Sequence, residues 1–197
     1  MKHSTPIEIL ENLADIGVSK TNCTLRKLIL MGIMAGAYIA FAGVASTMGA
    51  FNLLAEADTY GLGRILCGAI FTGGLVIVTL AGAELFTGNT LITISVLEKK
   101  TTVAKMLKNW IIVYISNFAG SVLIAWLVYN SGVLSSGIFA SNNEVFTMLS
   151  GAPADALEHL DWAGMFVNNL LPVTLGNVIG GMLMVAFGYW FSLKSKN

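Results

Sequence analysis

One apolar run of the sequence, residues 62–97, carries an acid, a hydroxyl, an amide and two glycines at its centre. The central segment, residues 81–89, reads Ala-Gly-Ala-Glu-Leu-Phe-Thr-Gly-Asn. An ionised Glu84 against lipid would cost about 2.5–3.5 kcal/mol on insertion scales, so it must face protein or a water-filled cavity. Irregular backbone is tolerated at membrane depth only in such places. We therefore predict a transmembrane helix that is interrupted between Glu84 and Asn89. The alternative is a glutamate that only bonds a neighbouring helix as structural support.

The composition is that of an integral membrane protein. Hydrophobic residues make up 55% of the chain and charged residues 11%, and the mean hydropathy is +0.75. The charge-free run 28–55 alone exceeds the roughly 20 residues that one helical span requires. The formal net charge is zero and no basic cluster is interleaved with aromatics, which excludes a nucleic-acid surface. We expect an all-α protein whose first partner is the lipid bilayer.

The sequence predicts a single transmembrane domain over residues 1–197. Its spans are expected at about 28–54, 62–97, 109–128 and 164–193. The basic residues precede the first span, join the second to the third, and follow the last: Lys20, Arg26, Lys27, Lys99, Lys100, Lys105, Lys108, Lys194 and Lys196. The other side carries only Arg64. By the positive-inside rule both termini are cytoplasmic, and we expect a bacterial inner-membrane location.

An amphipathic helix is predicted ahead of the first span, over residues 5–17. Thr5 and Glu8 have the spacing of a capping box, and Gly17 is expected to end the helix. The polar face is acidic, so packing beneath the bundle is favoured over binding to anionic lipid. Cys23 and Cys67 fall at opposite membrane faces in this topology, which favours free thiols.

Small and polar residues mark further helix surfaces. Glycines recur at four-residue spacing in the first and last spans, which predicts close helix packing within or between protomers: Gly32, Gly36, Gly176 and Gly180. Thr174 and Asn177 lie one turn apart after Pro172, so the last helix offers a second polar face toward the Glu84 cavity. The alternative is a kinked first turn without a polar role. The four tryptophans fall near span ends, where interfacial aromatics are expected: Trp110, Trp126, Trp162 and Trp190.

Three segments carry a more specific pattern. They are Gly-Ala-Glu-Leu-Phe-Thr-Gly-Asn at 82–89, Lys-Asn-Trp at 108–110 leading to Asn-Phe-Ala-Gly at 117–120, and Asn-Leu-Leu-Pro-Val-Thr-Leu-Gly-Asn-Val-Ile-Gly-Gly at 169–181. In this order they resemble the formate/nitrite transporter family, which includes formate, nitrite and hydrosulfide channels. The resemblance reaches from the amphipathic helix to Ser136 and resumes near Ile138.

The resemblance implies an aquaporin-like helical bundle of inverted repeats, assembled as a homopentamer with one pore in each protomer for small monovalent anions. By position, Leu85, Phe86 and Thr87 resemble the loop that gates or narrows the pore, between Glu84 and Asn89. Phe71 and Leu75 resemble the constriction of the family. Without the resemblance, both would be interpreted as lipid-facing or core residues.

The chain also departs from the family pattern. Family members have six spans, and here the sequence passes from Gly137 directly to Ile138, where the family has its fourth and fifth helices. The pore lysine and histidine of those helices are therefore missing. Neither His3 nor His159 is expected to substitute, because one lies at the N-terminus and the other in a charged outer loop.

The sequence favours transport over catalysis. It contains no metal-ligand spacing, no nucleophile beside a base and no phosphate-binding glycine loop, so we expect no enzyme and no cofactor. Three functions stay open: an anion channel or proton-coupled anion transporter, a non-conducting or truncated membrane subunit of the same family, and a pore for neutral solutes. The missing helices favour poor conduction or a segment present in the working protein but absent from this sequence.

Overall fold

The computed structural model describes residues 4–54, 56–133 and 163–194. The described residues form helices joined by short links, and four helices are long and apolar enough to cross a membrane. This confirms the predicted all-α membrane fold. In chain order the elements are α1 (Pro6–Thr21), α2 (Leu25–Leu54), α3 (Tyr60–Leu80), α4 (Phe86–Asn89), α5 (Ile92–Leu97), α6 (Val103–Ser131), η2 (Gly164–Leu170), α9 (Leu171–Val178), η3 (Ile179–Phe187) and α10 (Gly188–Lys194).

Helix α1 begins with the predicted capping box, in which the Thr5 hydroxyl and the Glu8 carboxylate each accept a backbone N–H. The helix does not end at Gly17, as predicted, but continues to Thr21. The reason is packing, because Gly17 is buried where α1 crosses α5, and the Ser95 side chain occupies the space of a Cβ at Gly17. The Ser95 hydroxyl also donates to the Ala14 carbonyl at 2.7 Å. Helix α1 therefore packs against the bundle.

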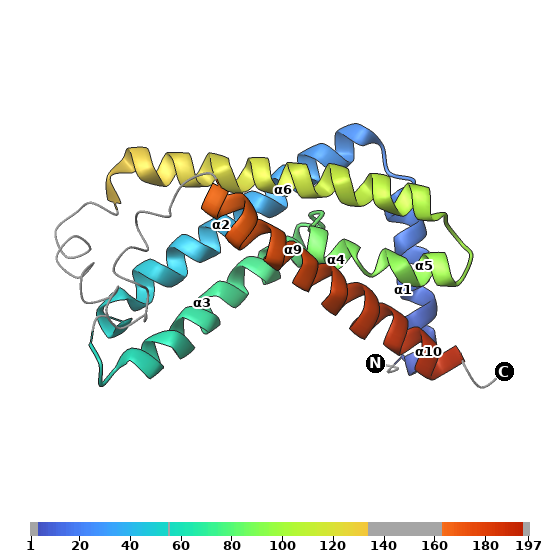
Figure 1. Ribbon diagram of the computed structural model, residues 1–197, viewed down its shortest axis with the longest axis horizontal. Helices are drawn as coiled ribbons and strands as arrows, with labels where there is room; N and C mark the ends of the chain where they lie inside the picture. The colour runs from blue at the N-terminus through green and yellow to red at the C-terminus, as the bar shows by residue number, and fades with distance from the viewer. Residues whose placement is uncertain (1–3, 55, 134–162, 195–197) are drawn as a thin grey trace.

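Helix α2 is the centre of the bundle, packed against α3 on one side and α6 on another (Figure 1). Its contact with α6 depends on two glycines. A Cβ at Gly36 would collide with the Asn117 backbone, and a Cβ at Gly120 would collide with the Ile33 carbonyl. Backbones at this distance exclude even a methyl group. The predicted close packing is thus present at Gly36, whereas none of the described atoms lies within 4 Å of a Cβ built at Gly176 or Gly180.

The second span is broken, as predicted, but the gap is shifted. Helix α3 ends at Leu80, the chain turns through Gly82 with φ +62°, and α4 begins at Phe86. The irregular segment is therefore 81–85, and residues 86–89, which we expected inside the gap, form a helical turn. The left-handed φ at Gly82 explains the position of the turn, because residues with a Cβ rarely adopt it.

The third span, α6, is longer than the predicted 109–128. Its N-cap Thr102 accepts a hydrogen bond from the Lys105 N–H, and its C-cap Gly132 is left-handed with φ +67°. These two caps set the ends of the helix. The last span runs without interruption from Gly164 to Lys194 and alternates π-helical with α-helical stretches, so Pro172 does not break it.

The two ends of the described chain lie at the same end of the bundle (Figure 1). The Tyr189 hydroxyl donates to the Pro6 carbonyl at 3.1 Å. At the same end, Glu98 accepts hydrogen bonds from the Trp190 indole and from the Lys194 ammonium. Burial by itself raises the pKa of Glu98, but these two donors outweigh it and hold the pKa below its ordinary value of 4.5. The last helix is thereby fixed to the link between α5 and α6.

The glycine contact between α2 and α6 gives a direct test. We expect Gly36→Ala to lower the free energy of unfolding by about 1–3 kcal/mol, the usual effect of forcing an extra carbon into a packed contact. The measurement is thermal unfolding of the purified protein in detergent. Gly43→Ala is the matched control in the same helix, because no atom of the described part of the chain lies within 4 Å of its Cβ position. Equal effects of the two substitutions would contradict the contact.

Candidate functional site: a cavity beside the broken helix

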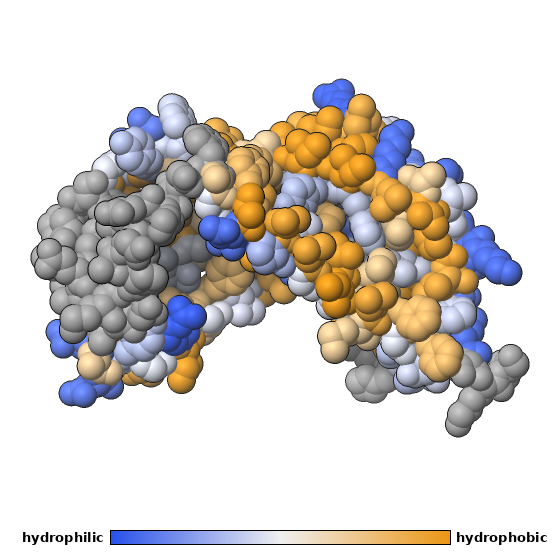
Figure 2. Space-filling view, viewed as in Figure 1, coloured by the Kyte–Doolittle hydropathy of each residue, from blue (hydrophilic) through white to orange (hydrophobic). Residues whose placement is uncertain are grey.

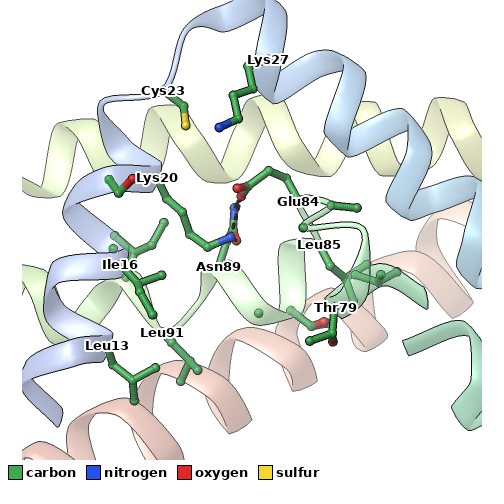
Figure 3. Close-up of a pocket in the computed structure, with 18 of the residues that line it drawn as sticks. Leu13, Ile16, Lys20, Cys23, Lys27, Thr79, Glu84, Leu85, Asn89 and Leu91 are labelled. Carbon is green, nitrogen blue, oxygen red and sulfur yellow. Dashed lines mark hydrogen bonds and ion pairs between the residues drawn. The ribbon is translucent and has the colours of Figure 1, made fainter. Parts of the chain in front are cut away.

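A cavity of about 800 Å³ lies between the C-terminal half of α1, the end of α3 and the segment from the break to α5. Figure 3 shows Lys20 reaching Glu84 and Asn89, with Lys27 beside Cys23 on the same cavity. Its wall combines apolar and polar side chains. The polar or charged lining residues are Ser19, Lys20, Lys27, Thr79, Glu84, Thr87 and Asn89.

Glu84 is held in place by two donors. It is only 6% exposed, and its Oε2 accepts a hydrogen bond from Lys20 Nζ at 2.8 Å and from Asn89 Nδ2 at 2.8 Å. Lys20 Nζ also donates to Asn89 Oδ1 at 2.9 Å. A buried carboxylate needs both a counter-charge and hydrogen bonds to remain ionised. The acid is therefore part of a closed polar triangle that ties α1 to the broken span.

A second layer of amide and indole groups supports this triangle from α6. Asn89 Nδ2 donates to Asn109 Oδ1 at 2.8 Å, and Asn109 Nδ2 donates to the Lys20 carbonyl at 3.2 Å. The Trp110 indole donates to the Asn89 carbonyl at 2.8 Å. Trp110 is 8% exposed, so this tryptophan near the start of α6 faces the protein interior. The indole is buried because it satisfies a backbone carbonyl beside the break.

Asn117 holds the irregular backbone itself. Its Oδ1 accepts the Phe86 N–H at 2.8 Å, while its Nδ2 donates to the carbonyls of Glu84 and Gly32, both at 2.8 Å. The Glu84 N–H donates to the Met31 carbonyl at 3.2 Å. A helix break inside a membrane leaves backbone groups that must find partners in the protein. One asparagine side chain on α6 thus satisfies a carbonyl inside the gap and the first N–H of α4.

The structure brings together most of the predicted loop residues. Leu75, Leu85 and Thr87 line the cavity with Glu84 and Asn89.

Two of the predicted residues lie elsewhere. Phe86 is buried beneath the loop and meets Trp110 and Tyr114 edge-on, with ring centroids 6.1 and 5.1 Å apart. Phe71 is exposed on α3 and is not among the residues that line the cavity.

The polar residues of the last helix face a different neighbour. The Thr174 and Tyr114 hydroxyls share a hydrogen bond of 2.8 Å, and Asn177 is half-buried one turn further on. Neither Thr174 nor Asn177 lines the cavity. The threonine thus joins the last helix to α6 at Tyr114, whose ring also contacts Phe86.

Sequence reasoning missed three groups that organise the site. The sequence placed Lys20 only among the basic residues on the cytoplasmic side, whereas in the structure it contacts Glu84 directly. Asn109 and Asn117 were part of the resemblance without an assigned role. Their spacing of eight residues puts both amides on one face of α6. Buried amides in an apolar helix indicate hydrogen-bond partners on other elements, but the sequence does not show which residues these are.

The two lysines of the cavity differ in their pairing. Lys20 is neutralised by Glu84, whereas Lys27 forms no ion pair with any residue that the structure describes. The Thr87 side chain adds a hydroxyl donor to the same wall. In the described ranges no three His, Cys, Asp or Glu side chains come close enough to hold a metal ion, and Cys23 and Cys67 are free thiols.

Comparison with known proteins decides the family. The sequence profile of the formate/nitrite transporter family matches residues 7–149. The chain belongs to this family. It is therefore a membrane transport protein, and the relatives named below are transporters or channels and not enzymes.

Three relatives show how the transporter aligns. A probable formate transporter of Methanothermobacter thermautotrophicus is 25% identical over 264 residues, covering 95% of this chain and 96% of that protein. The formate channel FocA of Haemophilus influenzae is 33% identical over 192 residues, covering 98% of this chain and 62% of that protein. The formate channel BtFdhC of Bacillus thuringiensis is 32% identical over 139 residues, covering 70% of this chain and 52% of that protein. This chain thus spans 62% of the Haemophilus protein and about half of the Bacillus protein, less than two thirds of each.

The polar triangle generates a second prediction. We expect Glu84→Ala to lower the free energy of unfolding by about 2–3 kcal/mol, because it leaves the Lys20 ammonium without its counter-charge. This expected loss of stability is smaller than for a fully buried ion pair, because the Lys20 side chain is 25% exposed. Selectivity should change less than stability. A carboxylate that faced a passing anion would repel it, so we expect Glu84 to support the loop and not to contact the anion.

The measurement is thermal unfolding beside anion-uptake ratios in reconstituted vesicles. Asp15→Asn is the matched control. Asp15 is paired with Lys100 at 2.6 Å, but its side chain is 68% exposed, so its removal should change stability little. A Glu84→Ala protein with unchanged stability and altered selectivity would contradict the supporting role of Glu84.

Proposed function

We propose that this transporter carries small monovalent anions, of the size and charge of formate, nitrite or hydrosulfide, through the cavity beside its broken helix. One observation supports this most strongly: the Lys27 ammonium and the Thr87 side chain share the wall of an open cavity in which Glu84 is already neutralised by Lys20. A cation and a hydroxyl donor without a facing free carboxylate favour an anion over a cation. The names of the formate-channel relatives agree with this class of solute.

The proposed site residues are those that the cavity or its supports contain. Leu75, Leu85 and Thr87 form the narrow part, and Glu84 with Asn89 holds the loop. Phe86 acts from beneath the loop by fixing its position against Trp110 and Tyr114. The remaining predicted residues are assigned more distant roles, as the outer constriction and as the last-helix support: Phe71, Thr174 and Asn177.

The proposed setting is the bacterial inner membrane, with both termini in the cytoplasm. The two ends of the described chain lie together, and the lysine-rich segments gather at that end, around Lys99 and Lys100. Protease added to sealed, right-side-out vesicles should cut the loop between α6 and the last helix. Cleavage of that loop from the cytoplasmic face alone would reverse the orientation.

The proposed assembly is a homopentamer with one pore in each protomer, as the family resemblance implies. Exposed apolar side chains along α6 and the last helix are consistent with contact to lipid or to neighbouring protomers (Figure 2).

A second candidate, a subunit that does not conduct by itself, is supported by the cavity's open side. Among the residues that the structure describes, no atom lies within 4 Å of a Cβ built at Gly82 or Gly88. The predicted loss of two helices at 137/138 falls outside the described residues.

Anion uptake into reconstituted vesicles tests the function. We expect formate uptake above that of empty vesicles, low in absolute rate, and reduced on the order of tenfold by Lys27→Gln, since a lost charge contact is worth about 1.4 kcal/mol or more. Arg26→Gln is the matched control, because it removes the neighbouring charge outside the cavity. Glycerol flux without formate flux would identify a neutral-solute pore instead. Absence of any flux would favour the non-conducting subunit.

A further inference from the structure

Three cations lie at the start of the α2–α6 pair, outside the cavity. Arg26 is in the first turn of α2, and Lys105 and Lys108 are in the first two turns of α6. All three side chains are exposed, and none of them lines the cavity. Lys105 Nζ donates to Asn22 Oδ1 at 2.9 Å, which joins the link before α2 to the start of α6. The cations of two helices are therefore neighbours.

Arg26 and Lys108 lie at nearly the same depth, because α2 and α6 run parallel and in contact (Figure 1). Gly32 on α2 lies against Ser116 on α6. At 1.5 Å per residue, Arg26 comes about 9 Å before Gly32 and Lys108 about 12 Å before Ser116. Both cations also stand where the apolar run of their helix begins. This is the depth of the phospholipid headgroups.

Both cations are on the outer side of the helix pair. At about 100° per residue, Arg26 is turned about 120° from the glycine contact and Lys108 about 80° in the opposite sense, which for parallel helices is the same side. The buried Met106 and Trp110 mark the other side of α6. Lys27 lines the cavity, so two consecutive cations of α2 serve different surfaces.

The same outer side is apolar at greater depth. Ile29 on α2 is 38% exposed, and Ile111 and Ile115 on α6 are 60% and 61% exposed. These side chains lie on the membrane side of the cations in each helix. The surface therefore combines cations at headgroup depth with isoleucines at the depth of the acyl chains.

The cations have no acidic partner in the part of the chain that the structure describes. The ion pairs found there use other lysines: Lys20, Lys100 and Lys194. The described end of α6 at Ser131 is more than 30 Å of helix from Lys108, at 1.5 Å per residue, roughly the thickness of the hydrocarbon core. A second copy in the same membrane orientation would bring its own Arg26 and Lys108 to this depth, where like charges repel.

A phosphate group fits this arrangement. A guanidinium binds two phosphate oxygens in a planar fork, and an ammonium binds as a point charge. A zwitterionic headgroup brings a cation of its own, whereas an anionic headgroup does not. We propose that Arg26, Lys105 and Lys108 form a binding site for one anionic phospholipid, whose acyl chains lie along the isoleucines below. The site is outside the cavity, so lipid binding does not depend on the anion pathway.

Native mass spectrometry of the full chain in detergent tests the site. We expect phosphatidylglycerol to bind about tenfold more tightly than phosphatidylcholine, because only the anionic headgroup leaves the cations neutralised. The double variant Arg26→Gln, Lys108→Gln should lose this preference. The matched control is Lys99→Gln, Lys100→Gln, which removes the same charge from the link before α6 and should keep the preference. Arg26→Lys with Lys108→Arg keeps the charge and should bind like the parent chain.

Every other result counts against the lipid site. Equal binding of the two lipids by the parent chain, or a preference that survives in the Arg26–Lys108 double variant, overturns it. Excess inorganic phosphate or glycerol 3-phosphate should not displace the lipid, and displacement would identify a site for soluble phosphate instead. The same spectra give the number of chains in each particle. Loss of oligomers in the double variant, with lipid binding unchanged, would assign the cations to a subunit contact.

Discussion

The hydrogen-bonded ion pair between Lys20 and Glu84 is the interaction on which the site depends. A carboxylate in an apolar bundle is tolerated only when its charge and lone pairs are satisfied. Here the counter-charge comes from the amphipathic helix that precedes the first span, and the remaining hydrogen bond comes from Asn89. The N-terminal helix is consequently part of the core of the protein, and its removal would leave Glu84 without its cation.

The break in the second span is stabilised by partners on two other helices, α2 and α6. Asn117 on α6 bonds the Glu84 carbonyl and the Phe86 N–H at the end of the gap, and the Met31 carbonyl on α2 accepts the Glu84 N–H. Phe86 packs the next turn against the aromatic residues of α6. These bonds replace the helical bonds that the break forfeits. The loop is therefore fixed from behind while its front faces the cavity, a suitable arrangement for a pathway that must stay polar and narrow.

The fold followed from the sequence more closely than the site did. Apolar run lengths predicted the four spans, and Glu84 with its glycines predicted the break, because the cost of burying charge and irregular backbone in lipid is large and local. The gap moved from 84–89 to 81–85 because the φ of Gly82 sets the turn. Lys20, Asn109 and Trp110 were not recognised as its partners, since contacts across 20 to 64 residues depend on how the helices pack. Gly17 continues its helix for the same reason.

The most direct test of this account is a double-mutant cycle on Lys20→Met and Glu84→Gln, read by thermal unfolding of the two single variants and the double variant. We expect a coupling energy of about 1–3 kcal/mol, the range for residues that share one hydrogen-bond network, so that the double variant loses far less stability than the two single losses added together. Additive losses would contradict the claim that this pair holds the N-terminal helix and the broken span together.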